Sequence, residues 1–90
     1  MLFMVIEHFD QARVKDVYAR FRERGRMAPA GVRYVDSWVS ADLGRCFQVM
    51  ECGDVALLQE WVLQWSDLAR FEIVPVASSK ATAEAVAKQF

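Results

Sequence analysis

The sequence is poor in cysteine and histidine, and each shortage excludes a class of protein. Its 90 residues contain two cysteines, too few for the disulfide framework of a small secreted domain. There is one histidine, and Cys46 and Cys52 lack the C-x-x-C spacing of metal ligands. We therefore expect no metal, no cofactor and a reduced, cytoplasmic protein.

Neither sign of charge dominates, and long apolar runs are missing. Eleven Lys and Arg against twelve Asp and Glu leave a formal net charge of -1, which excludes the basic field of a dedicated nucleic-acid-binding protein. No apolar run reaches the roughly 18 residues that suggest a membrane span. The apolar opening MLFMVIEHF lacks the basic start of a signal peptide. We expect neither nucleic acid nor a membrane as a partner.

Hydrophobic residues are plentiful instead. They make up 54% of the chain, which is enough for a compact core, and a chain of this length has room for a single core. We expect a domain over residues 1–77 and a C-terminal helical tail over residues 78–90.

The order of hydrophobic patterns predicts an α+β fold. Strand-forming runs cover residues 2–9, 33–41, 45–51 and 70–76. One amphipathic helix is expected between Asp10, a helix cap, and Gly25, a helix stop. A second follows Asp54, with Trp61 and Trp65 on its apolar stripe as core residues. Ser78 or Ser79 can cap the tail helix.

The order β-α-β-β-α-β is that of a ferredoxin-like fold. It predicts a four-stranded antiparallel sheet of strand order 4-1-3-2, with two helices on one face and the tail helix as an addition. Pro75 fits this order, because the fourth strand is an edge strand and proline cannot donate a hydrogen bond within a central ladder.

The hairpin loop decides which side chains share a face. A three-residue loop at Asp42-Leu43-Gly44, with Gly44 left-handed, places Trp38 opposite Gln48. A two-residue turn would shift this pairing by one residue. With the longer loop, a nearly pure apolar face contains Phe3, Val5, Phe9, Val35, Val39, Phe47, Val49, Phe71 and Ile73, with Glu7, Ser37 and Glu51 as polar exceptions. The mixed face contains Met4, Ile6, His8, Tyr34, Asp36, Trp38, Cys46, Gln48, Met50, Glu72 and Val74.

The mixed face predicts a homodimer. Helices are expected on the purer face, and the mixed face is too apolar to remain in water. A second copy packed face to face around a two-fold axis would cover it and enclose a small-molecule cavity. The alternative is that the tail helix covers this face within one chain.

The candidate site residues lie on the mixed face. His8 is the candidate catalytic base, because its ordinary pKa suits proton transfer. A His8–Cys46 pair is a second possibility, and its alternative is a buried histidine beside an inert thiol. Arg26, at the end of a basic run, could bind an anion. The expected ligand-binding residues are Met4, Ile6, Tyr34, Trp38, Cys46, Gln48 and Arg26.

Four segments resemble a bacterial family known as domain of unknown function 3303. They are MLFMVIEHF, RFRERGRMAPAGVRYVDSWV, RCFQVME and EWVLQWSDLARFEIVPV, and the resemblance covers nearly all of residues 1–79. The family is similar to members of the dimeric α/β-barrel superfamily. That superfamily contains cofactor-free monooxygenases, lactone isomerases, haem-degrading enzymes and proteins without known chemistry, so the resemblance implies a fold and no single activity.

Three functional hypotheses follow. The first is a homodimeric α/β barrel of unknown function that encloses a small-molecule cavity. The second is a cofactor-free monooxygenase or isomerase with His8 as the base. The third is a non-catalytic module that recruits another protein through the mixed face or the edge of the second strand.

Overall fold

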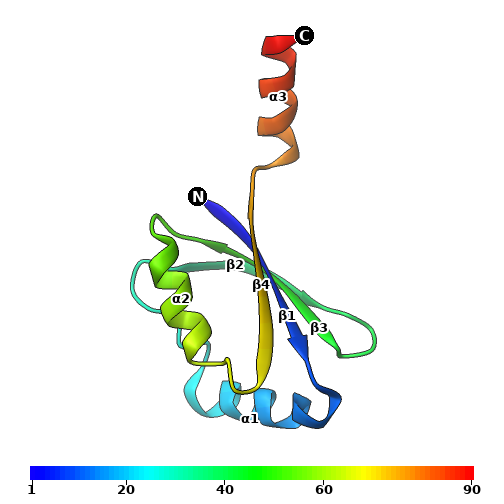
Figure 1. The fold of residues 1–90 in the computed structure, drawn as a ribbon, viewed down its shortest axis with the longest axis vertical. Helices are drawn as coiled ribbons and strands as arrows, with labels where there is room; N and C mark the ends of the chain where they lie inside the picture. The colour runs from blue at the N-terminus through cyan, green and yellow to red at the C-terminus, as the bar shows by residue number, and fades with distance from the viewer.

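A computed structural model describes all residues from 1 to 90 and has an α+β fold (Figure 1). The strands are β1 (Leu2–Phe9), β2 (Arg33–Val39), β3 (Arg45–Glu51) and β4 (Ala69–Val76). The helices are α1 (Val14–Arg24), which follows a 3-10 turn over Gln11–Arg13, α2 (Val55–Leu63) and α3 (Ser79–Gln89). The type and order of the predicted elements are confirmed.

The helix boundaries follow from local chemistry. The side chains of Asp10, Asp54 and Ser78 each accept a hydrogen bond from a backbone N–H in the first turn after them. Gly25 ends α1 with a φ of 69°, a left-handed conformation that glycine adopts without a steric penalty. These ends are the ones that the sequence predicts.

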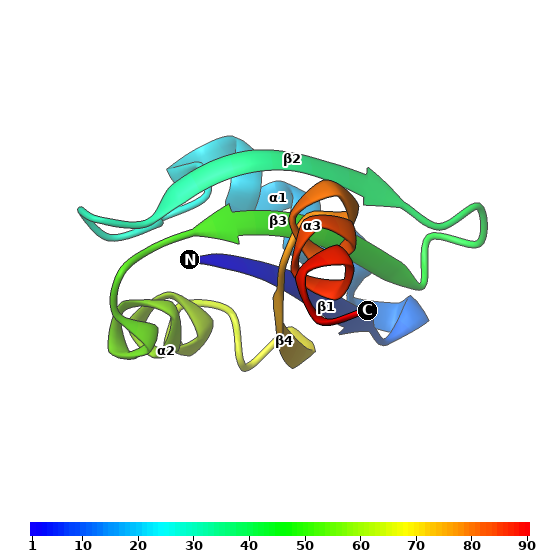
Figure 2. The same ribbon diagram turned by 90° about the horizontal axis from the view of Figure 1, so that it is seen from above.

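The four strands form one antiparallel sheet in the order β2-β3-β1-β4 (Figure 2). This is the predicted order read from the other edge. Pro75 lies on the edge strand β4, opposite Phe3, so its missing N–H interrupts no central ladder.

The predicted pairing of the hairpin strands is wrong by one residue. Trp38 lies opposite Phe47, and Ser37 lies opposite Gln48. A register shift between Tyr34 and Asp36 moves the start of β2 by one further residue. Since successive side chains of a strand point to opposite faces, this difference reverses the face that β3 presents relative to the prediction.

The conformation of the hairpin loop accounts for the difference. Ser40 and Arg45 pair across a four-residue loop, through a hydrogen bond from the Ser40 amide to the Arg45 carbonyl. Leu43, with a φ of 63°, is the left-handed residue in place of Gly44. The Asp42 carboxylate accepts hydrogen bonds from the Gly44 amide and the Ser40 hydroxyl, which stabilises this loop.

One face of the sheet is covered by helices, and β3 contributes Cys46, Gln48 and Met50 to it. Leu58 and Trp61 of α2 are buried in the core on this side. The full core consists of Phe3, Val5, Val17, Met50, Cys52, Leu58, Trp61, Trp65 and Leu68.

Helix α1 lies across one end of the sheet instead of along its face (Figure 1). Arg20 holds it there through two hydrogen bonds of 2.7 and 2.8 Å to the Asp67 carboxylate and one of 2.9 Å to the Gln64 carbonyl. Only Val17 of this helix is buried. The prediction that both helices lie along one face of the sheet is therefore confirmed for α2 and wrong for α1 (Figure 1).

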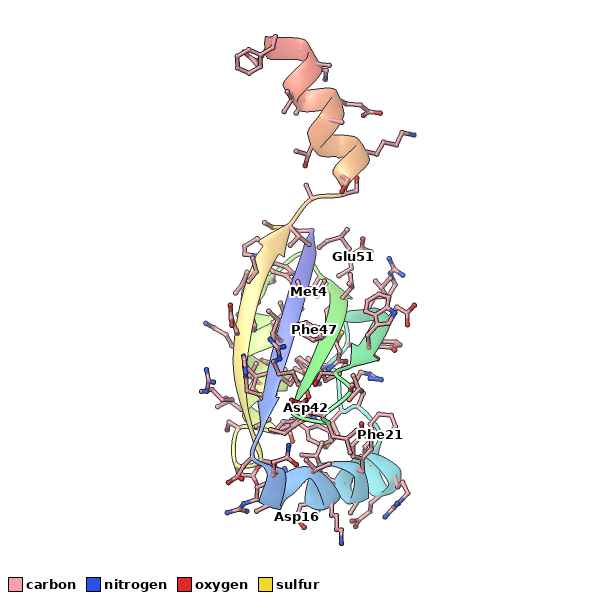
Figure 3. The ribbon with its side chains drawn as sticks, turned by 90° about the vertical axis from the view of Figure 1, so that its right-hand side faces the viewer. Met4, Asp16, Phe21, Asp42, Phe47 and Glu51 are labelled. Atoms are coloured by element: carbon pink, nitrogen blue, oxygen red, sulfur yellow. The ribbon has the colours of Figure 1, made fainter.

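The other face of the sheet, called the open face below, has no helix over it (Figure 3). Its apolar side chains are Leu2, Met4, Ile6, Trp38, Phe47, Val49, Val74 and Val76. Helix α3 projects away from the sheet, and none of its residues is buried (Figures 1 and 2). The tail helix therefore does not cover this face within one chain. No helix of the molecule has the length and apolar character needed to cross a lipid bilayer.

Candidate functional site

A cavity of about 240 Å³ lies between α1, the end of α2 and the helix-covered face of the sheet. It exists because α1 stands off the sheet, across its end. Its lining residues are Glu7, Phe9, Val17, Tyr18, Phe21, Arg26, Ser37, Val39, Cys46, Gln48, Trp61 and Trp65. Most of these side chains are apolar or aromatic, and a few polar groups converge among them, which is the usual composition of a small-molecule site.

Glu7 is the central polar group of the cavity. It lies on β1 between the core residue Val5 and Phe9, and its side chain is only 8% exposed. Burial raises the pKa of Glu7 to about 7, against the opposing effects of the Arg26 charge and the Gln48 hydrogen bond. At neutral pH this carboxyl group therefore exists in both protonation states.

A chain of hydrogen bonds connects Glu7 to Arg26. The side-chain amide of Gln48 donates to Oε1 of Glu7, and its oxygen accepts a hydrogen bond of 3.2 Å from Nη1 of Arg26. No protein group donates to Oε2 of Glu7, which is not fully enclosed either. One carboxyl oxygen is thus fixed by the protein, and the other has no protein partner.

The backbone at Arg26 is held by two tryptophans. The indole N–H groups of Trp61 and Trp65 both donate to the Arg26 carbonyl oxygen, at 2.9 and 3.0 Å. These bonds satisfy both buried indole groups and fix the loop that follows α1. The sequence predicts both tryptophans as core residues, and their second role as anchors of Arg26 follows only from the structure.

The guanidinium group of Arg26 is held by aromatic rings. Its central carbon lies 3.7 Å from the ring centre of Tyr34 and 5.2 Å from that of Phe21. Arg26 takes part in none of the three ion pairs of the molecule. Its positive charge is therefore positioned at the cavity without a carboxylate within 4 Å.

Cys46 lies directly opposite Glu7 on the neighbouring strand. Burial, together with the Glu7 carboxylate, raises the pKa of the Cys46 thiol to about 11. The thiol is protonated at neutral pH, and a thiolate nucleophile is disfavoured here. Cys46 contributes a small, polarisable surface to the cavity wall.

The structure divides the predicted ligand-binding residues between two places. Arg26, Cys46 and Gln48 line the cavity, and Tyr34 contacts it through Arg26. Met4, Ile6 and Trp38 lie on the open face instead. The prediction that these residues share a single mixed face is wrong, because the shifted register places the side chains of β3 on the opposite faces.

His8 lies on the open face, opposite Arg45. Its Nε2 atom is 3.5 Å from a carboxylate oxygen of Glu72 and has no hydrogen-bond partner. The predicted approach of His8 to Cys46 is wrong, because Cys46 pairs with Glu7 and faces the other side of the sheet. The role of His8 as a base stays a prediction.

Glu7 lines the cavity, and the sequence does not predict it as a candidate site residue. In the predicted sheet it appears only as a polar exception on an otherwise apolar face. An acidic residue on the core face of a predicted strand could have indicated a functional role for Glu7, because acidic residues are rarely fully buried without a partner. The structure also contains no group of three His, Cys, Asp or Glu side chains that could hold a metal ion.

Comparison with known proteins gives a family without an activity. The model of the family described as Domain of unknown function (DUF3303) matches residues 1–90. No curated protein matches the chain.

Proposed function

The chain belongs to the DUF3303 family, and we propose that it is a small-molecule-binding protein whose ligand occupies the cavity between the helices and the sheet. The observation that carries the proposal is the largely apolar wall of a 240 Å³ space in which Glu7, Gln48 and Arg26 converge. An apolar cavity of about 150 Å³ already admits benzene. The ligand is therefore a small molecule of about one ring.

We propose further that two copies assemble through their open faces. Val74 and Val76 are 39% and 36% exposed on this face. Trp38 is 55% exposed on this face. A second copy seated on the apolar side chains is the economical way to remove them from water.

The ligand cavity can be tested with toluene as a neutral probe. We expect toluene to shift the NMR signals of the Trp61 and Trp65 indole N–H groups, which lie at the cavity, and to leave that of Trp38 unchanged. Val39→Phe fills the cavity from the edge strand and should abolish the shifts. Val55→Phe is the matched control, because Val55 is similarly exposed and does not line the cavity.

Two results would contradict the cavity proposal. One is the absence of toluene-dependent shifts at both indole groups in the folded protein. The other is equal toluene binding by the Val39→Phe and Val55→Phe variants.

A further inference from the structure

The polar end of the cavity has the features of a site for an organic anion. Arg26 brings a positive charge that no carboxylate within 4 Å neutralises. Glu7 is more than nine-tenths buried, and its Oε2 atom has no protein partner. Both groups flank the side-chain amide of Gln48, so they lie at one end of the same space.

We propose that the cavity binds a small aromatic monocarboxylate as its anion, with the carboxylate against Arg26, and that Glu7 takes up one proton when the anion binds. This inference rests on the proposed function, since it names the class of ligand for the same cavity. Phe9, Phe21, Trp61 and Trp65 supply aromatic surface for the ring. The volume of the cavity suits one ring and one acidic group.

Proton uptake follows from the proximity of two acidic groups. An ionised Glu7 and an ionised ligand would repel each other in a site of low dielectric constant. A protonated Glu7 instead donates a hydrogen bond from Oε2 to the ligand carboxylate, and Arg26 adds a charge-assisted hydrogen bond. No covalent bond forms, and the proton comes from solvent.

The surroundings of Glu7 support its assignment as the titrating group. Arg26 from the loop after α1, Tyr18 from α1 and Cys46 from β3 are the titratable side chains that share the cavity with Glu7. The end of α2 contributes only tryptophans, and β4 places Phe71 opposite Glu7. Cys46 keeps its proton across the neutral range, because burial raises its pKa to about 11.

Benzoate is the probe for this proposal, with binding measured by calorimetry and by the Trp61 and Trp65 indole signals between pH 6 and pH 9. We expect benzoate affinity to be constant below about pH 7 and to fall about tenfold for each pH unit above it. Calorimetry above pH 7 in two buffers of different ionisation enthalpy should show uptake of one proton. Glu7→Gln should remove both the pH dependence and the proton uptake.

The contribution of Arg26 is tested with charge variants. Arg26→Met should weaken benzoate binding by roughly tenfold or more, since a charge-assisted hydrogen bond is lost. Arg26→Lys retains the charge and should lose less affinity. Arg24→Met is the matched control, because Arg24 lies at the exposed end of α1 and should bind benzoate like the original chain.

The outcomes separate this inference from the proposed function. If toluene binds and benzoate does not, the ligand class is wrong and the cavity proposal stands. If neither probe binds, both are wrong. Benzoate affinity that is independent of pH, or a pH dependence that persists in Glu7→Gln, would contradict proton uptake by Glu7.

Discussion

At the scale of single residues, Glu7 determines the chemistry of the site. Val5, two positions earlier on the same face of β1, points into the core, so Glu7 is buried by its place in the strand and not by a preference of its own. Burial favours the neutral acid, and the single hydrogen bond from Gln48 compensates only in part. A buried carboxyl group of this kind commonly marks a functional site.

The same burial predicts how stability depends on pH. The pKa of Glu7 is about 7 in the folded chain and about 4.5 when unfolded, so the unfolded state loses its proton first as the pH rises. The free energy of unfolding should therefore fall by about 3 kcal/mol as the pH rises from 4.5 to about 7. The fall should be absent in Glu7→Gln, as measured by urea denaturation at pH 4.5 and pH 7.5.

The quantity to compare is the difference in the free energy of unfolding between the original chain and Glu7→Gln, because every other titrating group contributes equally to both. Identical pH profiles for the original chain and Glu7→Gln would show that Glu7 is not titrating in this range.

At the scale of elements, the position of α1 creates the cavity. Its apolar residues Val17, Tyr18 and Phe21 face the sheet across that space, and Tyr18 and Phe21 remain about 40% exposed, at 41% and 43%. Arg20 holds α1 in this position, and the two tryptophan bonds to the Arg26 carbonyl hold the loop that follows it. A helix packed closely along the sheet would leave no such space.

Helix α3 contrasts with α1, because none of its residues is buried and Phe90 is 99% exposed. An isolated helix of eleven residues is marginal in water. Truncation after Ala77 should leave toluene binding unchanged and should change the free energy of unfolding by less than about 0.5 kcal/mol. A larger loss of stability on denaturation would show that α3 packs against a second copy.

At the scale of the whole molecule, one face of the sheet is not covered by any helix, and its apolar side chains remain exposed to water (Figure 3). The open face joins Met4 and Phe47 on neighbouring strands (Figure 3). A chain with such a face exposes apolar side chains to water, so association through this face should stabilise it.

We expect a dimer in solution, with a melting temperature that rises with protein concentration. Phe47→Glu places a charge on the open face and should convert the dimer into a monomer in analytical ultracentrifugation. Leu63→Glu is the control, because Leu63 is 73% exposed on α2, on the helix side of the sheet. A monomeric original chain would instead favour recruitment of a different protein by this face.

The sequence by itself determined the elements, their order and the sheet topology. These depend on local patterns that are present along the chain, such as the caps at Asp10 and Asp54 and the strand run Leu2–Phe9. The edge position of Pro75 likewise follows from the absence of its N–H.

Only the tertiary structure decided which face each side chain of β3 occupies. That choice depends on the length and conformation of one loop, and a change of one residue moves Cys46 and Gln48 from one face to the other. The cavity likewise depends on where α1 packs against the sheet, and the amphipathic pattern of α1 does not determine that position. Arg26, Cys46 and Gln48 are predicted from the sequence and line the cavity, whereas Glu7 joins them there only because the register of β3 places Cys46 and Gln48 on its face.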